Sequence, residues 1–197
     1  MEYRIFLGAL LLTGAVFCQE SVSAQTGNGT APQNKVCKVQ KDEIEIFASF
    51  LKQGESAPVQ TVVTTETEAI DVDVDYENLQ LAVKGQGIPS EIRADFKAKN
   101  KSNCLIEPFT GVTNLHFISR AEQDRLFRAG WTEFHKKYGK NAELTTFSRI
   151  GFNADKNLAL LHVSSGVDHN AAGGALYLLE KKAGKWLIKS HIGTWTT

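Results

Sequence analysis

The C-terminal third of the chain is a succession of strand-like segments with short connections, and this pattern constrains the fold more than any other feature. Four segments rich in aliphatic, aromatic and β-branched side chains follow one another, at residues 147–152, 158–164, 173–181 and 185–195. Turn-forming residues separate some of them, as at Ala183-Gly184. Sequential strands with short connections pair with their neighbours, so we predict a four-stranded antiparallel meander.

Helical patterns precede this meander. Residues 42–53 carry apolar side chains three and four positions apart, and a shorter helix is predicted from Pro89 to Lys101. Strands are predicted at residues 59–65 and 112–117, whereas the alternating segment 70–75 fits a strand or an extended lead-in. Helices that precede strands are typical of the α+β class, so we expect about three helices packed on an antiparallel sheet.

The best-defined helix prediction covers residues 119–139. Ser119 and Glu122 match a capping box, and Gly139 is typical of a helix C-terminus. Four aromatic side chains recur along one face of this segment, at Phe127, Trp131, Phe134 and Tyr138. We expect this aromatic stripe to pack on the sheet, and a ligand platform is the alternative. The expected sheet partners are Ile150, Phe152, Leu161, Leu179 and Trp186.

The first 24 residues are organised like a secretory signal peptide. An apolar run at residues 7–17 follows Arg4 and precedes the small-residue site Val22-Ser23-Ala24. As a helix, this run would rise only about 17 Å, against a hydrocarbon core of roughly 30 Å, which disfavours an anchor. Lipidation at Cys18 is disfavoured by the large Phe17 before it. We therefore expect a secreted or periplasmic protein, with residues 25–36 as a flexible leader and residues 37–197 as a single domain.

Cleavage of that signal peptide would leave Cys37 and Cys104 as the only cysteines. An oxidising compartment favours a disulfide between them, which in the chain-entropy model would contribute roughly 4 kcal/mol. Free thiols are an alternative. A catalytic thiol has no C-x-x-C motif or activating neighbour in the sequence to support it. We predict a structural disulfide.

The charge balance argues against several classes of partner. The chain has 22 basic and 22 acidic side chains, so it offers no surplus of positive charge for nucleic acid or an anionic membrane. Acidic residues concentrate in residues 25–80 and basic ones in residues 81–197. We interpret these regions as charge-complementary parts of one domain, with a basic surface for a polyanion as the alternative. We expect no nucleic-acid partner and no membrane span in the mature protein.

Candidate binding residues gather near one predicted loop. Residues 166–174 contain Asp168, His169 and Asn170 among small residues, and loops on rigid sheets often carry binding sites. Arg149, on a neighbouring predicted strand, could clamp a ligand carboxylate or form an ordinary ion pair. We select these four residues as the candidate binding set.

An enzymatic alternative uses the histidines of the meander. Strand pairing could bring His162, His191 and the Asp168-His169 pair together as a hydrolytic or metal-dependent centre. Their spacing matches no recognised metal motif, and strict alternation would turn His191 away from Trp186 and Ile188. No catalytic residue is identified, and no metal and no cofactor are expected.

One set of segments in the C-terminal half resembles the same region of a group of uncharacterised secreted bacterial proteins. The matching segments are residues 130–138, 147–153, 159–163, 173–174, 177–181 and 184–186, with Trp195. The resemblance implies a bacterial, exported α+β protein and implies no activity. We expect a non-enzymatic domain that binds a protein or small-molecule partner, and a hydrolase or metal-dependent enzyme is the alternative.

Overall fold

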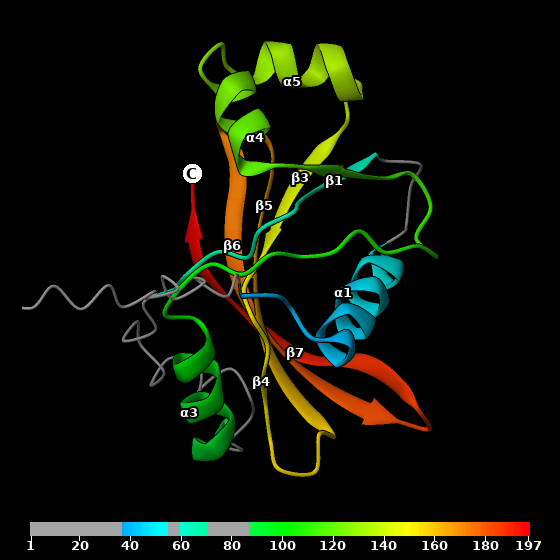
Figure 1. Ribbon diagram of the computed structural model, residues 1–197, viewed down its shortest axis with the longest axis vertical. Coiled ribbons are helices and arrows are strands. Elements are labelled where there is room, and N and C mark those ends of the chain that lie inside the picture. The colour runs from blue at the N-terminus through cyan, green and yellow to red at the C-terminus, as the bar shows by residue number, and fades with distance from the viewer. Residues whose placement is uncertain (1–36, 55–59, 71–86) are drawn as a thin grey trace, which may run out of the picture. The chain divides into compact units, whose positions relative to one another are not determined.

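The computed structural model describes residues 37–54, 60–70 and 87–197, which fall within one compact unit, Lys35–Thr197. The predicted signal peptide, the leader up to residue 36 and the alternating segment after Ile70 lie outside the described residues. The described elements, in chain order, are α1 (Lys41–Gln53), β1 (Thr61–Thr64), α3 (Ser90–Lys99), β2 (Leu115–Ile118), α4 (Arg120–Phe127), α5 (Trp131–Tyr138), β3 (Glu143–Phe147), β4 (Gly151–Phe152), β5 (Leu158–Asp168), β6 (Ala171–Lys182) and β7 (Lys185–Thr196). The α+β class is confirmed (Figure 1).

The described strands form one sheet in the order β2-β1-β3-β5-β6-β7, with β4 beside β5. Strands β5, β6 and β7 are antiparallel neighbours, which confirms the C-terminal meander. The sheet as a whole is mixed, because β1 is parallel to both β2 and β3. Parallel neighbours require long crossover connections, and α3 and then α4 and α5 lie in those connections. The expectation of a wholly antiparallel sheet was therefore wrong for the N-terminal strands.

The predicted strand at 147–152 is an interrupted strand. β3 and β4 pair with successive parts of β5, and residues 148–150 separate them. The Ser148 hydroxyl accepts a hydrogen bond from the backbone N–H of His162 at 2.9 Å, in place of a backbone carbonyl. This interruption releases Arg149 and Ile150 from the regular ladder, so that their side chains pack against α1.

Helix α1 covers one face of the sheet, which we call the α1 face. Its apolar side chains pack on strand residues that share that face, and the rings of Phe47 and Phe147 stack with centroids 4.5 Å apart. Leu161 and Leu179 lie in the same fully buried cluster. This cluster fixes the position of α1 over strands β3, β5 and β6.

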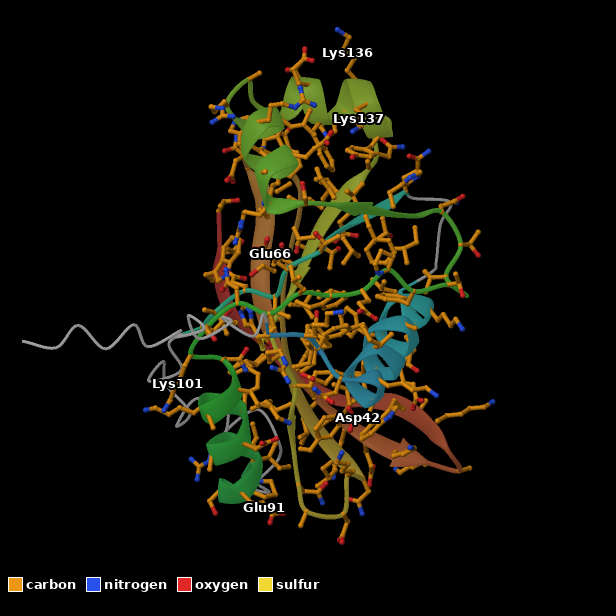
Figure 2. All side chains as sticks on the ribbon, in the orientation of Figure 1. Asp42, Glu66, Glu91, Lys101, Lys136 and Lys137 are labelled. Carbon is orange, nitrogen blue, oxygen red and sulfur yellow. A yellow bond between two sulfur atoms is a disulfide. The ribbon has the colours of Figure 1, made fainter. Side chains whose placement is uncertain are left out.

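The other three described helices lie on the opposite face, with α4 and α5 toward one end of the sheet and α3 toward the other (Figure 1). Ile92 and Phe96 of α3 are buried with Leu160 of β5. Lys136 of α5 extends away from the sheet (Figure 2), whereas Lys137 donates a hydrogen bond to Glu122 of α4. Among the described helices, none is long and apolar enough to cross a membrane.

The aromatic segment differs from its prediction in two respects. It forms two helices, because the chain turns at Gly130, whose φ of +84° is in the region that favours glycine. Phe134 and Tyr138 are buried, whereas Phe127 and Trp131 are only partly buried.

The sheet partners of this segment also differ from the expected ones. Phe134 packs with Val62 and Leu144. The five expected partners all lie in the α1 cluster instead. Successive strand residues point to opposite faces of the sheet. A strand residue one position away from a partner of α5 therefore packs under α1 instead.

The predicted disulfide is present. Cys37 and Cys104 are bonded, with their Cα atoms 4.7 Å apart. Cys37 lies just before α1 and Cys104 just after α3, so the bond joins the start of one helix to the end of another, and the two helices cover different faces of the sheet. The adjacent backbone pairs as well, since the Leu105 N–H donates to the Cys37 carbonyl at 2.9 Å.

Candidate functional site

Arg149, one of the predicted binding residues, is buried and fully occupied by the protein itself. Its Nε and Nη2 atoms each donate to the Glu43 carboxylate at 2.8 Å. Its Nη1 atom lies 3.0 Å from Cys104 Sγ and 3.3 Å from Cys37 Sγ. Arg149 therefore forms an ion pair beside the disulfide, which was one of the two roles predicted for it, and its charge is not presented to a ligand.

Glu43 is an N-terminal residue of α1 and is the partner that the sequence did not reveal. Its carboxylate accepts hydrogen bonds from the backbone N–H groups of Gln40 and Ile150, each at 2.9 Å, besides the two from Arg149. Both oxygens are therefore satisfied in an environment with no solvent exposure. Such a completely paired buried group is typical of structural ion pairs rather than of binding sites.

The Asp168–Asn170 segment is a tight turn and not the long loop that the sequence predicted. Strands β5 and β6 pair up to Asp168 and Ala171, leaving His169 and Asn170 at the turn. Asp168 Oδ1 accepts from both the backbone N–H and Nδ1 of His169, each at 2.6 Å. The bond from the His169 backbone is the main reason why the pKa of Asp168 lies below its ordinary value. The turn thus contains a local, exposed pair.

The histidines of the enzymatic alternative lie on different faces of the sheet. His162 is buried on the face opposite α1, and its Nε2 lies 2.9 Å from Thr194 Oγ1. Burial lowers the pKa of His162 to about 4, so the ring is neutral at physiological pH. No group of three or more metal-ligating side chains occurs in the part of the chain that the structure describes.

His191 instead stacks on Tyr177 on the α1 face, with ring centroids 5.5 Å apart. The expectation that His191 faces away from Ile188 was wrong. The register between β6 and β7 shifts, so that Leu178 pairs with Ser190 and Leu179 with Ile188. The extra residue, Lys189, shifts the alternation by one position, so the side chains of Ile188 and His191 lie on the same face.

A groove of about 780 Å³ opens on the α1 face beside the C-terminal end of α1. Small side chains form its floor, from Thr145 of β3, Ser165 of β5 and Ala175 of β6. These three side chains share one face of the sheet, because Thr145 pairs with Ser165 and Ala175 pairs with Val163, which is two positions from Ser165 along β5. The sheet surface is hollow here because α1 ends before it reaches these positions and no large side chain replaces the helix. This sheet groove is the candidate functional site.

The walls of the sheet groove are aromatic and aliphatic. Phe50 of α1 meets the edge of the Tyr177 ring at a centroid distance of 4.7 Å, and Tyr177 is held from its other side by His191. Ile188 of β7 extends the wall. Gln53 fixes the helix end to this strand, because its amide donates to the Trp186 carbonyl at 3.1 Å and accepts from the Ile188 N–H at 3.2 Å. The wall is therefore ordered without a ligand.

Glu143 supplies the only charge among the described side chains that line the sheet groove. It is the first residue of β3, it is half-buried, and no hydrogen bond or salt bridge to its carboxylate occurs within the described residues. Burial, and to a lesser extent the Glu143 charge, raises the pKa of the Tyr177 phenol, which therefore stays protonated at neutral pH. The sheet groove thus combines one negative charge, neutral hydroxyls and apolar walls.

None of the four candidate binding residues, Arg149, Asp168, His169 and Asn170, lines this groove. Glu143 and Tyr177 are 34 positions apart, and the segments between them carry no motif that links them. The one relevant signal was the run of small residues at 166–174, predicted as a binding loop, because Gly173 and Gly174 at its end line the groove from strand β6. No protein-family model matches this chain, and no curated protein and no solved structure shows a significant similarity to it.

Proposed function

We propose that this protein is an exported binding domain whose sheet groove holds a small amphipathic ligand with a protonated amine. The observation that carries this proposal is Glu143, a half-buried carboxylate without a hydrogen-bond or ion-pair partner among the described residues and the only charge among the described groove side chains. The contrast with Glu43, which the fold satisfies completely, supports a role for Glu143 outside the fold.

The groove lining supports a ligand with two chemically different ends. Phe50, Val163 and Ile188 offer apolar surface, which suits an aromatic or aliphatic body. A cationic head beside Glu143 would gain a charge-assisted hydrogen bond and could also contact the face of Tyr177. A carboxylate head would meet the Glu143 charge without a compensating cation in the described lining.

Export is proposed from three observations. The signal-peptide pattern of residues 1–24 points to secretion. The structure contains the Cys37–Cys104 disulfide, and disulfides persist in oxidising compartments but are rare in cytosolic proteins. The resemblance to secreted bacterial proteins agrees with both. Sequencing of the N-terminus of the exported protein should find Gln25 as the first residue, and recovery of Met1 from intact exported protein would contradict this proposal.

Three probes with one ring and different heads test the ligand class: benzylamine, benzyl alcohol and benzoate. Isothermal titration of the mature protein should show the tightest binding for benzylamine and the weakest for benzoate. Glu143→Gln should weaken benzylamine binding at least about tenfold while leaving benzyl alcohol binding unchanged. Glu133→Gln, which removes a carboxylate from the exposed side of α5, serves as the matched control.

Two results would contradict the proposal. One is benzoate binding as tight as that of benzylamine, and the other is an equal loss for both glutamate variants. Mass spectrometry of protein purified under non-denaturing conditions from its native host would then identify any resident ligand. A bound amine would support the assignment, and a bound acid would overturn it.

A further inference from the structure

A second cavity, of about 300 Å³, lies on the opposite face of the sheet and is walled by aromatic rings. Trp131 of α5, Trp195 of β7 and Phe127 of α4 line it, together with Glu68, Arg120 and Ser164. From the structure we infer that this aromatic pocket is a binding site for a single carbohydrate ring. The inference does not depend on the function proposed for the sheet groove, because Phe127, Trp131, Glu68 and Arg120 line this pocket alone, although Ser165 and Trp195 line both cavities.

Trp195 is held in place by a glycine. A Cβ atom at Gly174 would lie 2.1 Å from Trp195 Nε1 and 2.6 Å from its Cδ1. The indole therefore rests directly on the backbone of β6, and only the absence of a side chain at Gly174 permits this position. The side chain nevertheless stays 44% exposed. A large rigid ring with one face on the sheet and surface left open to the cavity is a typical platform for a ligand.

Trp131 supplies the second aromatic wall. It meets Phe127 and Phe134 edge to face, at centroid distances of 4.7 and 5.3 Å, and these contacts fix its orientation. Phe134 is completely buried, whereas Trp131 and Phe127 keep surface that faces the cavity. The aromatic stripe thus has two parts, one that packs in the core and one that lines a pocket.

The polar groups of the pocket are balanced in charge. Glu68 accepts a hydrogen bond from the Ser164 hydroxyl at 2.9 Å through one oxygen, and its second oxygen has no partner within the described residues. Arg120 donates to Gln123 at 3.3 Å, a contact that leaves further guanidinium donors. A lone cation would be opposed by Arg120 and a lone anion by Glu68. A neutral ligand that both donates and accepts hydrogen bonds satisfies both groups.

A sugar ring has this combination of properties. Its hydroxyl groups donate and accept hydrogen bonds around the rim, and its C–H face is apolar and can lie against an indole. The cavity volume is at the small end of the range of about 300–1,000 Å³ for ligand sites, which favours one ring over a long chain. The pocket is therefore matched to a neutral saccharide in size, in shape and in hydrogen-bonding character.

The tryptophans themselves provide the measurement. The chain has three, and Trp186 is buried in the α1 core, so Trp131 and Trp195 dominate any change in fluorescence on binding. The probes are the methyl glycosides of glucose, galactose, mannose and N-acetylglucosamine, at millimolar concentrations, with tetramethylammonium and inorganic phosphate as charged comparisons. At least one glycoside should give a saturable emission change and should protect the protein from acrylamide quenching.

Variants separate the aromatic pocket from the sheet groove. Trp195→Ala should abolish the glycoside response, and Gly174→Ala should weaken it at least about tenfold because the new methyl group displaces the indole. Gly193→Ala is the matched control, since a Cβ at this neighbouring strand position meets no described atom within 4 Å. Trp195 also lines the sheet groove, so the two sites are separated by Trp131→Ala, which lines the aromatic pocket alone. This variant should weaken the glycoside response and leave benzylamine binding unchanged, which distinguishes a failure of this inference from a failure of the proposed function.

Three outcomes would overturn the inference. One is the absence of a saturable response to every glycoside, and another is a response to tetramethylammonium or phosphate only. The third is a glycoside response that Trp195→Ala leaves unchanged while its thermal melt stays that of the parent, because the sugar would then be bound elsewhere.

Discussion

Two glutamates illustrate how the same side chain serves different purposes in this molecule. Glu43 is buried at the start of α1, and both of its oxygens accept hydrogen bonds from Gln40, Arg149 and Ile150. Glu143 lies half-buried in the sheet groove, where no hydrogen bond or salt bridge from the described residues reaches its carboxylate. The fold neutralises the charge of Glu43, whereas no described residue neutralises the charge of Glu143.

The comparison shows that burial alone does not identify a functional charge. A buried carboxylate is tolerated only when its desolvation is offset by an opposite charge and by hydrogen bonds, and Arg149 with two backbone N–H groups provides both. A carboxylate that keeps part of its solvation needs no such partner, so its presence in a cavity is not explained by stability. Side chains that the fold needs should therefore lower stability when they are replaced, whereas side chains that only line a cavity should not.

The largest effect is expected from breaking the buried pair. Arg149→Ala should lower the free energy of unfolding by about 3–5 kcal/mol, because it leaves the Glu43 charge buried without a partner. Urea denaturation of the oxidised protein measures this loss. The double variant Glu43→Leu/Arg149→Met should recover most of it, since it removes both charges. A loss below about 1 kcal/mol in the single variant would show that the pair is not structural.

The aromatic stripe allows the same contrast among apolar residues. Phe134→Ala should cost about 3–5 kcal/mol, because the ring is fully buried and its removal leaves a cavity. Trp131→Ala should cost clearly less, about 1 kcal/mol, because the indole is partly exposed in the aromatic pocket. Thermal and urea melts of the two variants give the comparison. Equal losses of unfolding free energy would show that Trp131 is a core residue and would remove support for the aromatic pocket.

His162 should make stability depend on pH. Burial lowers its folded-state pKa from 6.5 to about 4. Between these values the unfolded chain takes up a proton that the native protein does not. Stability is therefore complete above pH 6.5 and falls as the pH decreases toward 4, by about 3 kcal/mol in total. Urea melts across this range should show the decline, and His162→Leu should flatten it relative to the exposed control His191→Leu.

The smallest effect is expected at the groove carboxylate. Glu143→Gln should change the free energy of unfolding by less than about 0.5 kcal/mol, because the described residues give its charge no partner to lose. A parallel urea melt and benzylamine titration test this directly. A destabilisation of more than about 2 kcal/mol would assign Glu143 to the fold, and the comparison with Glu43 would no longer hold.

Part of the fold followed from local rules. The meander was predictable because each strand is bounded by turn residues and pairs with its neighbour in sequence, as β5, β6 and β7 do. Helix α1 was predictable from its apolar spacing and the glycine at its end. The disulfide was predictable because removal of the predicted signal peptide would leave Cys37 and Cys104, which allow only one pairing.

Features that depend on a single residue of register were not predictable. Helix α4 ends at Phe127, and the chain turns at Gly130 before α5 begins, so the aromatic stripe is divided between two helices. The bulge at Lys189 places His191 on the face of Ile188, against strict alternation. Each of these changes depends on local backbone geometry that the hydrophobic period does not record.

The sequence by itself determined the class of fold, the order of its helices and strands, and the one disulfide, because these depend on local periodicity and on a pairing without alternatives. Only the tertiary structure decided which charged side chains pair with one another inside the fold. Arg149 meets Glu43 across a sequence separation of 106 residues, and the sheet groove is made of side chains from strands that become neighbours only in the sheet. Partners so distant along the chain are selected by packing, which no local pattern encodes.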